Sequence, residues 1–165
     1  MMKKLLFLPL IILGLSLSVV SCKKDKPNGE EPEVIDSLLL NTKILLEIEG
    51  FESLEGNLAI AIYNNSETFN SETEFYREAA FTVSADDMSV VIDSMDAGTY
   101  AISILHDEDE SGDMEMGGFL NLIPQEGFGF SNNPVIGLSE PSFSDCKFAI
   151  DEGQAVSVPI TLIYM

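Results

Sequence analysis

Short runs of alternating apolar and polar residues dominate the chain after residue 40. Residues 43–49 read KILLEIE, which places Ile44, Leu46 and Ile48 on one face and the charged side chains on the other. Residues 58–62 repeat this pattern after the turn signal Glu55-Gly56-Asn57. A side-chain period of two is the geometry of a β-strand with one buried face, so both runs predict strands.

The same alternation predicts seven strands, separated by turns rich in Gly, Asn, Asp and Ser. These strands cover residues 43–49, 58–62, 81–83, 88–92, 99–106, 148–150 and 156–164. Pro159 lies in the last of them and indicates an edge strand or a bulge. Connections of this length are typical of sandwiches, including those of immunoglobulin-like type.

No long amphipathic helix pattern is present. One short helical turn is predicted over residues 66–76, where Ser66 could cap the first turn and Phe69 could pack inward. Residues 34–165, 132 in number, suit one domain with a core of its own. The predicted fold class is therefore all-β, a single β-sandwich of about seven strands with one short helical turn.

The N-terminus has the three parts of an export signal. Lys3 and Lys4 precede a sixteen-residue apolar run, 5–20, and Ser21-Cys22 follows it. This run is short for a membrane span, which needs about 20 apolar residues. We predict a signal peptide at 1–21. By similarity to bacterial lipoproteins, Cys22 would then carry acyl chains such as palmitate; the alternative is an ordinary signal with an incidental cysteine.

Residues 22–33 continue as a polar segment with the sequence CKKDKPNGEEPE, which favours a flexible tether. More than one acyl chain on Cys22 would hold the domain at a bilayer without a spanning helix. The expected partner is a membrane, through the N-terminal lipid. We expect a cell-envelope location at the outer membrane, on its periplasmic face or at the cell surface.

The charge is strongly negative. The chain has eight Lys and Arg against 28 Asp and Glu, and all the acidic residues follow Cys22. Six basic residues remain after the predicted cut, so the mature net charge is −22. Such a chain repels phosphate backbones, and we expect no nucleic-acid partner. Residues 78–146 contain fourteen carboxylates and no Lys or Arg, so an external cation could relieve their repulsion.

The acidic segment 106–115, HDEDESGDME, is the sharpest chemical feature. Side chains with oxygen atoms recur at every second position, namely Asp107, Asp109, Ser111, Asp113 and Glu115. Gly112 is free to take a left-handed conformation. Calcium prefers six to eight oxygen ligands, and the first six positions match the opening of an EF-hand loop. The twelfth position is Gly118 instead of Glu, so Glu115 would have to close the shell. The segment predicts a calcium site; the alternative is a solvated acidic turn.

Three further features favour structural roles. His106 is in phase with the apolar face of its strand, which indicates a residue at the rim of the core with one hydrogen bond. Cys146, at the start of a predicted strand, has no partner if Cys22 is acylated, and we expect it to be buried and inert. Residues 124–134 form a long loop in which Phe128 and Phe130 would bury together; a ligand platform of aromatic and amide side chains is the alternative.

The chain offers no catalytic constellation, because one histidine would have to serve every base role. We therefore predict a binding or structural module and no enzyme, with an envelope protein or a carbohydrate as a candidate partner. The alternative is an envelope hydrolase. Its candidate residues would be His106 with Asp107 or Glu126 and a serine such as Ser103 or Ser131. Paired carboxylates, as in glycosidases, are the other form that this alternative could take.

Four stretches together resemble a bacterial family, domain of unknown function 2141. They read, in order, EGNLAIAIYNNSETF, DAGTYAISILHDEDESGDME, GFLNLIPQEGFGFSNN and PSFSDCKF. The resemblance covers about residues 44–164. It implies a secreted or periplasmic β-sandwich similar to prealbumin-like modules, with no established activity. Members usually have glycine where this chain has Glu110, so the loop here carries more charge.

Overall fold

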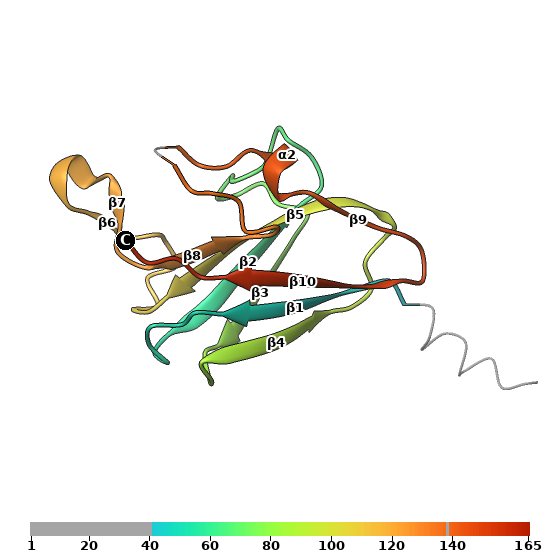
Figure 1. Cartoon of the computed structure of the whole chain (residues 1–165), viewed down its shortest axis with the longest axis horizontal. Helices are drawn as coiled ribbons and strands as arrows, with labels where there is room; N and C mark the ends of the chain where they lie inside the picture. The colour runs from blue at the N-terminus through green and yellow to red at the C-terminus, as the bar shows by residue number, and fades with distance from the viewer. Residues whose placement is uncertain (1–40, 138) are drawn as a thin grey trace, which may run out of the picture. The chain divides into compact units, whose positions relative to one another are not determined.

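The computed structural model describes residues 41–137 and 139–165 (Figure 1). They belong to one compact unit, Pro32–Met165, which contains the whole hydrophobic core described below. A unit with its own hydrophobic core can in principle fold by itself. The predicted signal peptide 1–21, Cys22, the tether 22–33 and residues 34–40 lie outside the described residues.

Two sheets form the body of the domain. The smaller has the order β10-β1-β4 and the larger the order β3-β2-β5-β8, with β9 also paired to β5. The smaller sheet consists of β1 (Lys43–Glu49), β4 (Asp87–Ile92) and β10 (Ala155–Thr161). The larger consists of β2 (Asn57–Tyr63), β3 (Arg77–Thr82), β5 (Gly98–Asp107), β8 (Gly127–Phe130) and β9 (Phe148–Ile150). β10 is an edge strand, as Pro159 predicts, and it runs parallel to β1.

The apolar faces of the two sheets form the core. Ile44, Leu46 and Ile48 of β1 are buried together with Ile60 of β2 and Ile102 of β5, each at most 2% exposed. Alternate residues of each strand point to this layer, which is how two stacked sheets exclude water between them. The structure confirms the prediction of an all-β sandwich.

A short arm extends from the sheets, at the left of Figure 1. It contains the two-residue strands β6 (Met116–Gly117) and β7 (Ile123–Pro124), which pair with each other, and the 3₁₀ turn Phe119–Asn121. Among the described residues, no helix has the length and apolarity that crossing a membrane requires.

The helical turn predicted over 66–76 is wrong. In that segment, Asn65 Oδ1 accepts the backbone N–H groups of Glu67 and Thr68, at 2.9 and 3.1 Å. Ser71 Oγ likewise accepts from Glu74 at 3.1 Å. Such local bonds from side chains to the backbone compete with helical hydrogen bonds, so the segment forms bends and one turn, closed by Ser71 N–H and the Thr68 carbonyl at 2.9 Å. The short α-helix is α2 (Phe143–Cys146), which begins with a capping box formed by Ser142 and Asp145.

Cys146 is the last residue of α2, not the first residue of a strand, and it is fully buried as predicted. Its neighbours include Ala101, Phe128 and Phe130 in a second apolar cluster, on the outer side of β5. Burial, together with the nearby charge of Asp145, raises the pKa of the Cys146 thiol to about 11. The thiol is therefore held in its protonated, unreactive form at neutral pH.

The predicted loop 124–134 contains an additional strand, β8. Phe128 and Phe130 bury together as predicted, with their ring centroids 6.1 Å apart. Gly127 and Gly129 alternate with these phenylalanines and face the opposite side, where a Cβ on Gly129 would lie 2.7 Å from the side chain of Ile160. The strand therefore has its large side chains on the outer face and none on the inner face.

The first prediction compares two adjacent leucines of β1. Replacing buried Leu46 with alanine should lower the free energy of unfolding by about 2–5 kcal/mol, because the core cannot close the cavity. Leu45 is half-buried on the opposite face, and the same substitution there should cost about 1 kcal/mol. Urea unfolding of both variants measures this, and equal losses would contradict the assignment of the core face.

The second prediction concerns pH and Cys146. Its pKa is about 11 in the folded protein against 9.0 ordinarily, so the folded state binds more protons between these values. This contribution is complete below pH 9.0 and is lost as pH rises towards 11. The stability of the native protein relative to Cys146→Ala should therefore fall over that range, measured by urea unfolding. A constant difference between the two proteins would contradict the prediction.

Candidate metal centre

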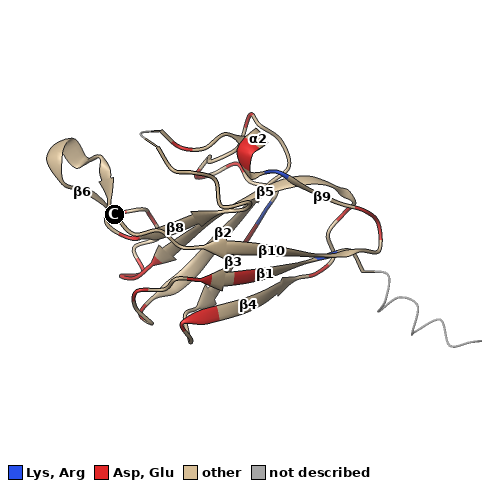
Figure 2. Ribbon diagram, viewed as in Figure 1, with Lys and Arg blue, Asp and Glu red and all other residues tan. Residues whose placement is uncertain are grey.

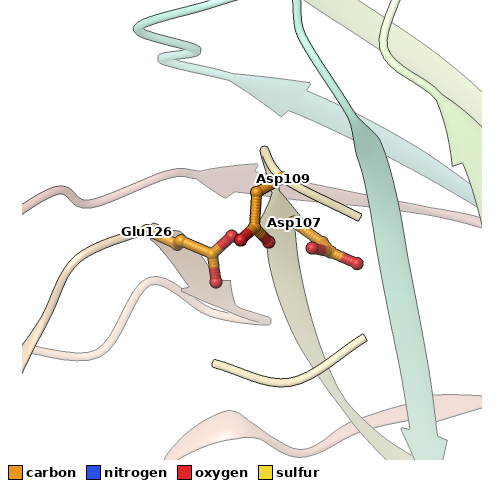
Figure 3. Close-up of side chains that lie close together, drawn as sticks. All are labelled: Asp107, Asp109 and Glu126. Carbon is orange, nitrogen blue, oxygen red and sulfur yellow. The ribbon is translucent and has the colours of Figure 1, made fainter. Parts of the chain in front are cut away.

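Three carboxylates converge where β5 ends and β8 begins. Asp107, Asp109 and Glu126 each place one oxygen so that all three oxygens lie within 4.8 Å of one another. Figure 3 shows the carboxylates of Asp109 and Glu126 directed toward one another, with Asp107 beside them. Asp107 and Glu126 are buried, at 6% and 4% exposed, whereas Asp109 is exposed.

Strand pairing brings Asp107 and Glu126 together. β5 and β8 are antiparallel, with His106 opposite Gly127. Asp107 follows His106 and Glu126 precedes Gly127. In an antiparallel pair these two residues therefore lie opposite each other, just beyond the last paired residues. Cross-strand neighbours have Cβ atoms about 4.5–5.5 Å apart, close enough for short acidic side chains to meet.

The loop after β5 wraps around its own aspartates. Asp107 accepts the backbone N–H of Ser111 through Oδ1 at 2.9 Å and that of Gly112 through Oδ2 at 3.0 Å. Asp109 Oδ1 also accepts from Ser111 N, at 3.0 Å. Gly112 and Glu110 have φ angles of 88° and 59°, so both turn left-handed. The tight turn forms here although residue 110 is not glycine.

Glu126 ties both ends of the same loop. Its Oε1 accepts the N–H of Glu108 at 3.0 Å, and its Oε2 accepts the N–H of Glu115 at 3.1 Å. These charge-assisted bonds hold the carboxylate in a fixed orientation. Glu126 therefore supplies the additional carboxylate that the sequence analysis expected from Glu115. Glu115 contributes only its backbone N–H to this arrangement.

The structure thus brings together two of the five sequence-predicted ligands, Asp107 and Asp109. Ser111 supports them through its N–H, and its hydroxyl donates to the carbonyl of Asp113 at 3.0 Å. The carboxylates of Asp113 and Glu115 are not part of the three-residue cluster. The sequence signal for Glu126 is its place directly before the GFGF run, but only strand pairing relates that run to β5.

One family matches the chain over residues 46–158: domain of unknown function 2141, described as an uncharacterized protein conserved in bacteria. The chain belongs to this family. No curated protein and no solved structure matches it. The matched region includes the whole acidic cluster, so in this member of family 2141 the cluster is part of the family domain.

The cluster has the dimensions of a single-ion site. Two oxygens that bind the same calcium at 2.3–2.6 Å are separated by no more than about 5 Å. The three oxygens of this family 2141 protein meet that limit. Each carboxylate oxygen has two lone-pair sites, so a backbone N–H on one leaves the other free for a cation.

His106 directly precedes Asp107 in the chain, and its side chain lies on the core side of β5. Its Nδ1 is 2.6 Å from the Tyr164 hydroxyl and its Nε2 is 2.8 Å from the carbonyl of Glu55. The side chain is fully buried. These contacts agree with the structural role predicted for His106, but the side chain is fully buried instead of lying at the rim, and two ring nitrogens are engaged instead of one.

Proposed function

We propose that this protein is a lipid-anchored, non-catalytic module of the cell envelope whose acidic cluster binds calcium. The observation that carries the calcium assignment is the convergence of Asp107, Asp109 and Glu126, with oxygens within 4.8 Å of one another. Oxygen-only ligands and a high negative charge favour a hard cation such as calcium over zinc.

Electrostatics supports a cation at this place. Like charges at this separation repel each other, and the repulsion is larger for buried groups because water screens it less. Residues 78–146 provide no Lys or Arg to offset it. The backbone N–H groups orient the carboxylates but carry only partial charges, so a bound divalent cation would lower the remaining repulsion.

The cluster is also placed to link separate parts of the chain. Asp107 ends β5, while Glu126 precedes β8 and holds the N–H groups of Glu108 and Glu115. A cation shared by these carboxylates would join the ends of the two strands and order the segment between them. This favours calcium as a stabilising ion.

The surroundings of the hydrolase candidates support a role without catalysis. Ser131 is fully buried; its hydroxyl donates to the carbonyl of Cys146 at 2.6 Å and accepts from the N–H of Ile102 at 2.9 Å. The ring nitrogens of His106 are likewise engaged with Tyr164 and Glu55. These side chains hold strands and turns together, which is a structural use of groups that a hydrolase would present to substrate.

The calcium proposal predicts a saturable response. Adding 10 mM calcium to the fragment 32–165 should raise its unfolding free energy by about 1.4 kcal/mol if the dissociation constant is about 10⁻³ M. Asp109→Asn should weaken binding at least tenfold, because it removes one ligand charge from the exposed side of the cluster. Calorimetry and thermal melting, each against EDTA, measure the two effects.

The control is Asp113→Asn, which removes a carboxylate from the same loop but outside the cluster. It should change the calcium affinity by less than threefold. The absence of any heat or melting shift at 10 mM calcium would exclude the site. Equal weakening by the two variants would indicate diffuse attraction to the loop's negative charge.

The anchor makes a separate prediction for the full chain expressed in a bacterial host. The native chain should incorporate labelled palmitate and sediment with membranes, whereas Cys22→Ser should do neither, because it removes the thiol that is acylated. Cys146→Ser, the matched control, should remain labelled. Unchanged labelling of Cys22→Ser would exclude this anchor.

A further inference from the structure

A groove of about 1010 Å³ lies on the outer face of the larger sheet, the face turned away from the sandwich core. This volume is at the upper end of the range for pockets that bind small molecules, about 300–1,000 Å³. The groove is distinct from the acidic cluster, although Gly112, Asp113 and Met114 of the acidic loop form part of its wall.

Strand register explains why the outer surface of the sheet is concave here. Two rows of outward side chains cross the four strands β3, β2, β5 and β8. The first row is Ala80, Ala59, Leu105 and Phe128, and the second is Glu78, Ala61, Ser103 and Phe130. Ala59, Ala61 and Ser103 occupy three of the four middle positions and Leu105 the fourth, and a phenylalanine stands at one end of each row. The small alanine and serine side chains leave a trough beside the phenylalanines, and the sheet forms the floor of this trough.

Apolar and aromatic side chains form part of the walls of the groove. Tyr63 ends β2 and Phe75 lies in the segment after it, while Met114 and Leu122 come from the acidic loop and the arm. The arm, residues 116–124, adds an uncharged extension, drawn entirely in tan in Figure 2. Its Phe119, Leu120 and Leu122 are 68–82% exposed, so the apolar surface continues beyond the groove.

The charged groups that line the groove are all acidic. They are Glu72, Glu78, Asp113 and Glu140, and no Lys, Arg or His is among the described lining residues. Asn70 also lines the groove: its Nδ2 donates to Glu140 Oε2 at 3.2 Å, but its buried Oδ1 has no hydrogen-bond partner. The four carboxylates are therefore the charged groups that a ligand in this groove would meet.

We infer that the groove binds a small amphiphilic molecule that has an apolar body and one cationic head group. The apolar body would lie on the alanine floor between the phenylalanines and the arm. The head group would lie among the carboxylates at the rim. This inference goes beyond the proposed calcium site and is independent of calcium binding.

The floor favours a small molecule over an extended peptide. β2 is hydrogen-bonded to β3 and β5, and β5 is hydrogen-bonded to β2 and β8, so their backbone groups are already paired. A peptide added as a strand needs unpaired backbone groups at a sheet edge, which a sheet face does not offer. Recognition at this floor must therefore use side-chain contacts, which suit a compact ligand.

The test uses the fragment 32–165 and three probes with the same ten-carbon chain, each below its critical micelle concentration. Decyltrimethylammonium should bind at one saturable site by calorimetry. Decyl sulfate and decyl maltoside should bind at least tenfold more weakly, because neither has a positive charge. The titrations are run both with EDTA and with calcium, and saturable binding in EDTA separates the groove from the calcium site.

Two pairs of variants locate the site. Ala61→Trp fills the floor and should weaken the binding of decyltrimethylammonium at least tenfold, whereas Val91→Trp, at an exposed position of β4 in the smaller sheet, should change it less than twofold. Glu78→Gln, which keeps the size of an exposed side chain, should weaken binding about three- to tenfold. Asp93→Asn, which removes a charge outside the groove, should have less than a twofold effect.

Several results would overturn the inference. They are equal affinity for the three probes, equal effects of Ala61→Trp and Val91→Trp in folded proteins, and binding without saturation. A peptide of alternating leucine and lysine is the competing ligand. If it binds more tightly than the ammonium probe and loses this affinity in Ala61→Trp, the groove is a peptide site instead. If Ala61→Trp does not fold, the comparison of Glu78→Gln with Asp93→Asn decides between specific binding and diffuse attraction.

Discussion

The alternation of side chains along β5 is the constraint on which the rest of the structure depends. β5 pairs with β2 on one side and with β8 and β9 on the other. Its inward residues Ile102, Ile104 and His106 belong to the core, while its outward residues Ser103 and Leu105 form part of the groove floor. A shift of the strand by one residue would exchange the two sets, so the core fixes which side chains the outer face presents.

The acidic end of β5 is held in place by contacts on the core side of the strand. His106 joins the carbonyl of Glu55 to the hydroxyl of Tyr164, so the first turn and the C-terminal segment meet beneath the cluster. Gly56 lies so close to the carbonyl of Asp107 that any side chain there would collide with it. A carboxylate cluster can stay assembled only when such contacts fix the backbone that carries it.

Local patterns predicted much of this fold. Six of the seven alternating runs correspond to β1, β2, β4, β5, β9 and β10, and Pro159 marked an edge strand. The seventh run, 81–83, covers only the end of β3. The failures occur where local side chains changed the backbone. Asn65 and Ser71 capture N–H groups that a helix over 66–76 would need, and the GFGF run forms a strand because β5 offers it an open edge.

The sequence alone determined the class of the domain, its negative charge and the presence of an acidic loop with a left-handed glycine, because each depends on neighbouring residues. Only the tertiary structure decided that Glu126 joins Asp107 and Asp109, since that contact depends on the register between β5 and β8. The groove is likewise a tertiary feature. Ala59, Ala61, Ala80 and Ser103 make a floor only when three strands align, and no single strand encodes a hollow surface.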